Sequence, residues 1–529
     1  MIQRQTQTAQ YWDEAFSIED ADLEHLYTLL LEDETPLTTD ELVLALVRRR
    51  VEREEHAIQR QMYGAGSLYQ PKESYTVGQE LIFPQMDFAN GKVASVRAGN
   101  NPEFNSFDVI TVDFGPDRPQ RSFAARLENH KLNAANGSLA DGESHARTPA
   151  EIAADYHRVI APKLEARLRA KGDIVRIAAR WFPKGLLADI HEGHLNLAEA
   201  VLDMAGGGPL PTLELMTHLE LPATVNEKLR VFSLDYALQE DARFDEVGPA
   251  GQVQWHLRRL EPAEVREAPR CLRYEADTPS SPVRLHPDLI KLEHDLDDEF
   301  SPLNSETAPP AKEVTLSLTF PHLRAGTLPL SNKLSPLFPT AYESPRIRFI
   351  LVDGHTGEKR PGWVVRQARY VFGLAEWYKK YDMPVGGHLT VQQGGSPGEV
   401  IVKIARRRPV REWVRTATVN GRLSFSMQKR PIPVEYDEQM IVAVDNPAAL
   451  DDIWQKMAHA PLEKVVLDIF RELAKLTPQS AVHARSLYSA VNVVRRAPPG
   501  DIFGELILRP YYAHVGDAYW RFDESHFSE

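Results

Sequence analysis

Basic side chains gather in one stretch of this 529-residue chain, from Ser344 to Arg430. The stretch contains 17 lysines and arginines against 6 aspartates and glutamates, a net charge of +11. Because the whole chain carries −14, the residues outside the stretch sum to −25. A basic region inside an acidic protein can bind a polyanion while the rest of the molecule repels one. The residue types therefore predict contact with the phosphates of a nucleic acid.

Strand patterns position these charges. Arg346–Val352 begins by alternating charged and apolar residues, as a half-buried strand does. A short helix is expected over 375–381, and further strands over 362–366, 369–372, 388–392, 399–405 and 413–419. Together these elements predict a compact β-barrel with one short helix and arginines on its outer face. The adjacent Arg406, Arg407 and Arg408 point in different directions on a strand end, so they are expected to contact phosphate without reading sequence.

This region also resembles a known DNA-binding fold. LSNKLSPLFP, followed by a strand, a turn and GWVVRQARYVFGLAEWYKKYDMPVGGHLTV, resembles the pseudobarrel domain of plant auxin-response transcription factors and related restriction-enzyme effector domains. In that family two arms grip the major groove. The resemblance implies a first arm at Ser331, Asn332 and Lys333 and a second at Arg366, Gln367 and Arg369. The usual Gly-Asp after the helix is Gly386-Gly387 here. The candidate nucleic-acid-binding residues are Asn332, Lys333, Arg366, Gln367, Arg369, Lys379, Lys380, Arg406, Arg407 and Arg408.

Local signatures of catalysis and of metal binding are missing from the sequence. There is no phosphate-binding loop, no nucleophile elbow and no His-Glu-x-x-His motif. His191-Glu192-Gly193-His194 lacks the i, i+4 histidine pair, so we expect a helix cap or turn there. The single cysteine, Cys271, excludes an internal disulfide and a zinc site built mainly from cysteine. We therefore expect no enzyme activity, cofactor or metal, although a catalytic site assembled from distant residues would leave no local motif.

Hydropathy argues against a membrane protein. No apolar run approaches the ~20 residues that a membrane span needs, and the amino terminus lacks an apolar segment of signal-peptide type. The single thiol fits a reducing compartment. The expected location is the cytoplasm, with no membrane partner.

Residues outside the basic stretch suggest further modules. Residues 1–66 have helical periodicity, with a capping signal at Thr38-Thr39-Asp40-Glu41, and are expected to form a helix-turn-helix-like pair. Residues 67–136 alternate and turn as a small five-stranded barrel does, and they resemble Tudor or KOW domains. Residues 261–312 are rich in proline and acid and are expected to be a linker with a short helix over 289–300. Asp295, Asp297 and Asp298 are expected to be solvated there.

Two units share a pattern of helices followed by a two-stranded wing. In 148–260 a helical region precedes strands that carry Phe244 and Trp255, and in 447–529 the wing carries Tyr512 and Trp520. Both units resemble HARE-type winged helices, the group that includes the amino-terminal domain of the bacterial RNA polymerase delta subunit. The aromatic residues are expected to anchor the cores.

These observations predict an α+β multidomain protein in which winged-helix units accompany a small β-barrel and a central basic pseudobarrel at 313–446. The leading hypothesis is a protein that binds double-stranded DNA and acts in transcription or its regulation. One alternative is a scaffold that binds RNA polymerase or another protein without catalysis. A second alternative is a recognition subunit of a restriction or defence system.

Overall fold

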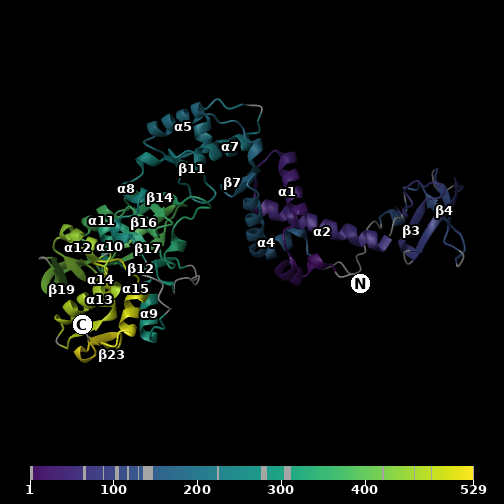
Figure 1. The fold of residues 1–529 in the computed structure, drawn as a ribbon. Coiled ribbons are helices and arrows are strands. Elements are labelled where there is room, and N and C mark those ends of the chain that lie inside the picture. The colour runs from purple at the N-terminus through teal and green to yellow at the C-terminus, as the bar shows by residue number, and fades with distance from the viewer. Residues whose placement is uncertain are drawn as a thin grey trace. The chain divides into compact units, whose positions relative to one another are not determined.

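The computed structural model describes residues 4–63, 67–86, 89–101, 106–115, 118–128, 130–134, 147–222, 225–275, 283–302, 311–419, 422–457, 459–477 and 479–527. The chain divides into two compact units, Met1–Leu187 and Ala188–Glu529 (Figure 1). Both units contain helices and separate β-sheets, so the expected α+β architecture is confirmed. Within the described ranges, no helix is long and apolar enough to traverse a bilayer.

The first unit contains a module made from two stretches of sequence. Its elements are α1 (Asp20–Asp33), β1 (Leu37–Thr38), α2 (Thr39–Tyr63), α4 (Pro149–Lys171), β7 (Ile174–Ile177) and β8 (Arg180–Pro183). The antiparallel sheet has the order β1-β8-β7. Thr148 caps α4 by accepting a hydrogen bond from the Glu151 amide, and Gly172, which has a φ of 73°, caps the carboxyl end of the helix. The strands β7 and β8 lie in a region expected to be helical.

A five-stranded sheet is inserted between α2 and α4. Its strands are β2 (Ser67–Leu68), β3 (Glu80–Phe83), β4 (Ala89–Ala98), β5 (Asp108–Asp113) and β6 (Arg121–Ala125), and a short helix, α3 (Lys131–Ala134), follows. The strands lie in sequence order. Leu81, Val93, Ile110 and Val112 are buried in the core of this sheet. The structure thus has the five strands that the alternation in 67–136 predicts.

The second unit begins with a module of three helices and three strands. Its elements are α5 (Glu192–Met204), β9 (Leu210–Pro211), α6 (Thr212–Met216), α7 (Glu227–Glu240), β10 (Phe244–Glu246) and β11 (Gln254–Leu257). The sheet order is β10-β11-β9. His191 caps α5, because its Nδ1 accepts a hydrogen bond from the Gly193 amide at 3.1 Å. The expectation of a cap at this histidine pair is confirmed.

A curled seven-stranded sheet, a half-barrel, forms the middle of the second unit. Its strands are β12 (Glu313–Ser317), β13 (Thr327–Pro329), β14 (Arg346–Asp353), β15 (Lys359–Val365), β16 (Tyr370–Phe372), β17 (His388–Gln393) and β18 (Glu399–Ile404). Their order is β12-β17-β18-β14-β15-β16-β13, in which only the β14–β18 pair is parallel among the pairs described. Two short helices accompany the sheet, α10 (Phe320–Ala325) and α11 (Ala375–Lys380). The alternation of β14 buries Ile347, Phe349 and Leu351, as its sequence predicts.

The strand expected over 413–419 belongs to a different sheet. It is part of β19 (Arg406–Val419), which pairs with β20 (Leu423–Val434) and β21 (Val442–Val444) in the order β20-β19-β21. The expectation of one barrel therefore needs correction here. The reason is packing, because Val414, Ile432 and Ile441 form an apolar cluster of their own beside the half-barrel core.

The carboxyl-terminal module completes the second unit. Its elements are α12 (Leu450–Met457), α13 (Leu462–Ala474), β22 (Ala481–His483), α14 (Ala484–Val491), α15 (Pro499–Leu508), β23 (Tyr512–Gly516) and β24 (Tyr519–Phe522). Its sheet order is β22-β24-β23. Two helices of the stretch expected to be a linker, α8 (Ala263–Arg266) and α9 (Pro287–Leu296), pack here, because Val265, Leu289 and Leu292 share a core with Phe470 and Phe503.

Three modules thus share one connectivity: helix, short strand, helix, helix, and two strands. In each, a buried tryptophan of the last strand lies opposite the short strand, at Trp181–Leu37, Trp255–Leu210 and Trp520–Val482. The next helix begins directly after the short strand, with Thr39, Thr212 and Ala484. Two of these modules lie within 148–260 and 447–529, where the sequence predicts helices followed by a two-stranded wing. The module of α1, α2 and α4 was not predicted, and it is split by the inserted five-stranded sheet.

Candidate nucleic-acid interface

The two predicted arms lie next to each other at one edge of the half-barrel. The first arm, Ser331, Asn332 and Lys333, follows β13, and the second, Arg366, Gln367 and Arg369, forms the turn between β15 and β16. Ser331 is buried and donates a hydrogen bond to Asp297, so its predicted contact with DNA needs correction and five candidate residues are left. β13 pairs with β16, and the Leu330 amide donates a hydrogen bond to the Arg369 carbonyl at 2.8 Å. The structure therefore brings these five predicted residues together.

The segment 294–300 contacts both arms. Lys333 Nζ donates a hydrogen bond to the His294 carbonyl at 2.5 Å, and Arg369 Nη1 donates one to the Glu299 carbonyl at 2.8 Å. The Arg369 guanidinium also lies 6.0 Å from the ring centre of Phe300. Part of the hydrogen-bonding capacity of the arms is therefore used within the protein.

The other five predicted residues lie at α11 and at the start of β19. Lys380 Nζ is 5.1 Å and the Arg406 guanidinium 5.3 Å from the ring centre of Tyr381, so both cations contact the same aromatic ring. Arg407 lies over Tyr436 at 4.8 Å. Lys379 and Arg408 are exposed. This second group is thus also gathered in one part of the fold.

Carboxylates offset some of this charge. Lys380 Nζ lies 3.0 Å from Asp353 and 3.1 Å from Glu358, and Lys379 lies 3.9 Å from Glu376. Burial alone would raise the pKa of Asp353, but hydrogen bonds from the Tyr381 hydroxyl, the His355 amide and Lys380 hold it below its ordinary value. Because Asp353 stays ionised, it neutralises Lys380, and Arg406 and Arg408 contribute more to a positive potential here.

A second basic surface lies on the hairpin of β19 and β20. Its residues are not among the candidate residues predicted from the sequence. We define the hairpin face as Arg411, Trp413, Met427, Lys429 and Pro431. All five side chains are exposed, and Trp413 is 59% exposed. They share one side of the sheet, because Arg411 pairs with Pro431, Trp413 with Lys429 and Arg415 with Met427. The signal in the sequence was the alternation REWVR opposite MQKRP.

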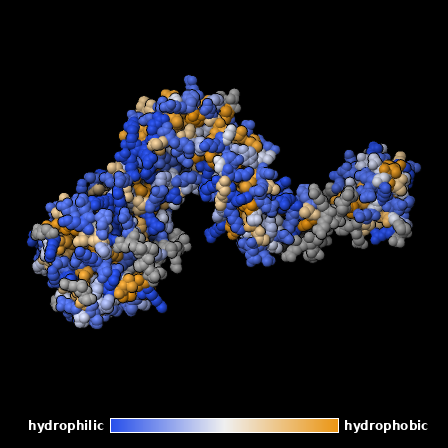
Figure 2. Space-filling model, viewed as in Figure 1, coloured by the Kyte–Doolittle hydropathy of each residue, from blue (hydrophilic) through white to orange (hydrophobic). Residues whose placement is uncertain are grey.

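The hairpin face combines an aromatic ring with unshielded cations. Lys429 Nζ lies 5.3 Å from the ring centre of Trp413. Residues 406–434 contain eight lysines and arginines and one carboxylate, Glu412, whose place in the register is on the opposite side of the sheet from Trp413. In Figure 2 hydrophilic side chains cover most of the visible face of the second unit, with apolar residues in small patches. An exposed ring beside cations can stack on a base or lie against a sugar while the cations bind phosphates.

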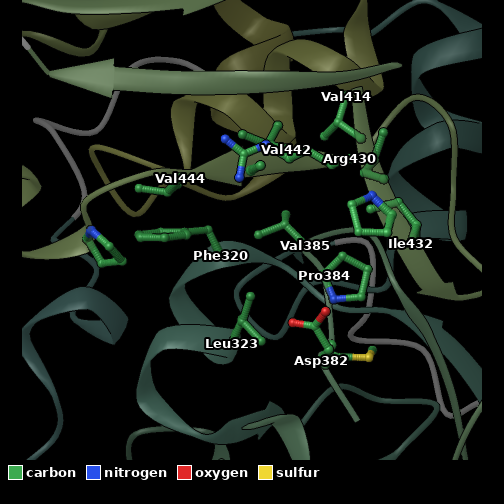
Figure 3. Close-up of a pocket in the computed structure, with 15 residues that line it drawn as sticks. Phe320, Leu323, Asp382, Pro384, Val385, Val414, Arg430, Ile432, Val442 and Val444 are labelled. Carbon is green, nitrogen blue, oxygen red and sulfur yellow. The ribbon is translucent and has the colours of Figure 1, made fainter. Parts of the chain in front are cut away.

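The opposite side of the hairpin closes a cavity of about 410 Å³ (Figure 3). Apolar side chains from the half-barrel, such as Phe320 and Val385, face Val414 and Val442 of the hairpin sheet. The two ionisable lining residues are Asp382 and Arg430. Arg430 is already bound, because its Nη2 donates to Gln428 at 2.9 Å and forms an ion pair with Asp445. The lining of this cavity offers no nucleophile paired with a base.

A buried charged network lies where α9, α10 and α14 meet. Arg496 Nη2 donates to both oxygens of Asp298, at 2.7 and 2.8 Å, and lies 2.8 Å from Glu299 Oε1. Tyr488 donates its hydroxyl to Asp298 at 2.6 Å, and His322 Nε2 lies 3.2 Å from Glu299. All five residues are buried. The network therefore fixes the acidic segment that contacts the arms.

The charges of this network stabilise one another. Burial alone would raise the pKa of Glu299, yet the neighbouring Arg496 and His322 hold it below its ordinary value. Burial alone would lower the pKa of Arg496, but Asp298 and Glu299 raise it well above its ordinary value. We expected the aspartates of this segment to be solvated; the structure instead buries Asp297 and Asp298.

Comparisons with protein-family models, with curated proteins and with solved structures found no match to this chain.

Proposed function

We propose that this chain is a multidomain DNA-binding protein of the transcription or regulation class, with the hairpin face and the adjacent cations at Arg406 and Arg408 as its principal contact. The carrying observation is the exposed Trp413 flanked by Arg411 and Lys429 on a face whose five positions hold no carboxylate. Phosphate contacts supply most of the affinity of such a surface, and they make binding fall with salt.

Other features support the same proposal. The two predicted arms are adjacent, as a pseudobarrel that grips DNA needs them to be. The three modules have the order of helices and strands expected of winged helices, which can place a helix in the major groove. In this proposal these modules assist the basic surface, because they are not basic themselves: residues 192–257, for example, contain 3 lysines and arginines against 11 aspartates and glutamates.

Fluorescence anisotropy with a labelled duplex, measured with the full chain at several salt concentrations, tests the proposal. We expect Arg411→Gln with Lys429→Gln to reduce the slope of log K against log salt by about 1.8, since each phosphate contact contributes about 0.9. The matched control is Arg259→Gln with Arg273→Gln, which removes the same charge from arginines paired with Asp203 and Glu267. No binding at low salt, or equal slopes for both double variants, would refute the proposal.

Trp413→Ala gives an independent measurement on the same face. Stacking on an aromatic ring contributes about 1–3 kcal/mol per unpaired base, so binding to a single strand should weaken about 5- to 150-fold if the ring stacks. Because Trp413 is 59% exposed, we expect the variant to fold as the unchanged protein does. A smaller loss on duplex than on single strand would show that the ring requires unpaired bases.

A protein-binding scaffold is the second candidate function. The observation that favours it is the same ring, because exposed tryptophan and arginine often dominate protein interfaces. A partner such as RNA polymerase would then be retained by the full chain and lost with Trp413→Ala, whereas DNA binding would be absent.

A further inference from the structure

Three side chains that can bind metal meet on the surface of the second unit. His286, Asp288 and His514 each offer a ligand atom, and these atoms all lie within 4.8 Å of one another. His286 Nδ1 is 3.3 Å from Asp288 Oδ2, and the two imidazole ring centres are 4.9 Å apart. In the part of the chain that the structure describes, this is the one group of three such residues with this spacing.

The fold, rather than the sequence, brings the three residues together. His286 precedes the first residue of α9, and Asp288 lies in the first turn of that helix. The Leu289 side chain is buried in the core, and this packing fixes the position of the first turn. His514 belongs to β23, where it lies opposite Trp520 with 5.0 Å between the rings. Two separately anchored elements thus supply the ligands.

We propose that His286, Asp288 and His514 bind a divalent transition-metal ion of the zinc class. Imidazole nitrogens and a carboxylate oxygen are ligands that zinc prefers, and three protein ligands leave a position for water. Ligand atoms around a tetrahedral zinc are about 3.3 Å apart, so the most distant pair must close by small side-chain rotations. All three side chains are exposed, and the His286 side chain makes no capping hydrogen bond. The rotations therefore disturb only surface contacts, namely the His286–Asp288 pair and the ring contacts of His514.

The ion would join the start of α9 to the carboxyl-terminal module. α9 leads into the segment 294–300, which contacts the predicted arms and contributes to the buried network. An ion that binds the native state and not the unfolded state raises stability. Metal binding therefore strengthens the attachment of this acidic segment, independently of any nucleic acid.

Isothermal titration calorimetry with zinc chloride tests the site on the full chain, prepared without a histidine tag and stripped with a chelator. We expect binding of one zinc ion per chain at this site, and loss of at least about tenfold in affinity, or about 1.4 kcal/mol, in His514→Ala and in His286→Ala. Thermal melting should show a higher midpoint with zinc for the unchanged chain and a smaller rise for both variants.

The matched control is His526→Gln. His526 is also an exposed histidine of the carboxyl-terminal module, and its Nδ1 lies 3.1 Å from Asp523. It belongs to no group of three ligands among the described residues. Its replacement should leave zinc affinity unchanged. The unchanged chain and the three histidine variants should melt at the same temperature in chelator, which establishes that the substitutions leave the fold intact. If one histidine variant melts lower, Asp288→Asn replaces it as the test of the site. The proposal is overturned if zinc does not bind, or if affinity is the same in the unchanged chain and the two histidine variants.

Discussion

Replacing Arg496 with leucine tests whether the buried network holds the acidic segment in place. The Arg496 guanidinium is 2% exposed, and the Asp298 and Glu299 carboxylates beside it are 1% and 3% exposed. Leucine fills part of the space but leaves Asp298 without its cation and Glu299 with His322 alone beside it. Removing one partner of a buried ion pair costs about 3–5 kcal/mol, because the remaining charge stays desolvated.

The loss of stability in Arg496→Leu can be measured as a faster exchange of backbone amide hydrogens. If opening of α9 and α14 becomes easier by about 3–5 kcal/mol, their amides should exchange about 150 to 5,000 times faster. Hydrogen-exchange mass spectrometry on the full chain measures this locally and needs no two-state transition. Peptides from 287–301 and 484–496 should respond, whereas α4, in the other unit, should not.

Arg509→Leu is the control, because it removes the same charge from a surface arginine paired with Glu463 and Glu505. An exposed ion pair contributes about 0–1 kcal/mol, so its effect should be several-fold at most.

The two variants should also differ in how the deficit depends on pH. Glu299 is ionised in the native protein with a lowered pKa, and its contribution is lost only as pH falls below the ordinary value near 4.5. Without Arg496, burial favours the protonated carboxyls, so the deficit of Arg496→Leu should shrink from pH 7 to pH 5. Equal exchange in both variants, or a deficit independent of pH, would refute the reasoning.

Three further substitutions test other parts of the fold. Burial raises the pKa of Asp235 to about 7, so its ionisation should reduce the free energy of unfolding as pH rises from about 4 to 7, and Asp235→Asn should flatten that dependence in denaturant titrations at several pH values. Thr39→Val removes the hydroxyl that accepts a 3.0 Å hydrogen bond from Trp181 Nε1, which should cost about 1–3 kcal/mol and appear as faster exchange in β8. Gly326 has a φ of 66°, and an added Cβ would lie 2.5 Å from the Ala375 Cβ, so Gly326→Ala should destabilise the half-barrel by more than the ~1–2 kcal/mol of the left-handed conformation alone, measured by thermal melting.

Local patterns predicted local elements well. The strand at Arg346–Asp353 and the helix at Ala375–Lys380 occur where alternation and helical spacing place them. Alternation in a strand and helical spacing in a helix are both patterns among residues close together in the sequence. Such patterns determine which side of the element faces the core. The break between the half-barrel and the hairpin sheet was not visible, since residues on both sides of Ala405 have the same strand pattern and only packing separates the cores.

Interrupted elements were harder to recognise. The module of α1, α2 and α4 has its halves on either side of an inserted sheet, and its last strands, Ile174–Ile177 and Arg180–Pro183, are short. Segments of four residues, three of them apolar, fit a buried helix as well as a strand. The recurring tryptophan is the signal that would have helped, because Trp181 occupies the place of Trp255 and Trp520.

The acidic segment shows why charge along the sequence does not determine exposure. Asp297 and Asp298 read as solvated because charged residues usually are, yet both are buried. Asp297 accepts a hydrogen bond from the Ser331 hydroxyl, and Asp298 is bound by Arg496, 198 positions later. The signal lay on the side of Arg496: Arg495 and Arg496 follow VNVV, which has three valines in four residues, and an arginine buried among apolar residues requires a carboxylate.

The partners that the fold supplies also decide which cations are available to a polyanion. Lys333 and Arg369 donate hydrogen bonds to backbone carbonyls of 294–300, and Lys380 is neutralised by Asp353. Arg411 and Lys429 lie on a face whose five positions carry no carboxylate. A bound phosphate would have to compete with existing partners at the arms but not at the hairpin face. Binding should therefore begin at the hairpin, and contact by the arms should follow only when nucleic acid displaces the segment that the buried network holds.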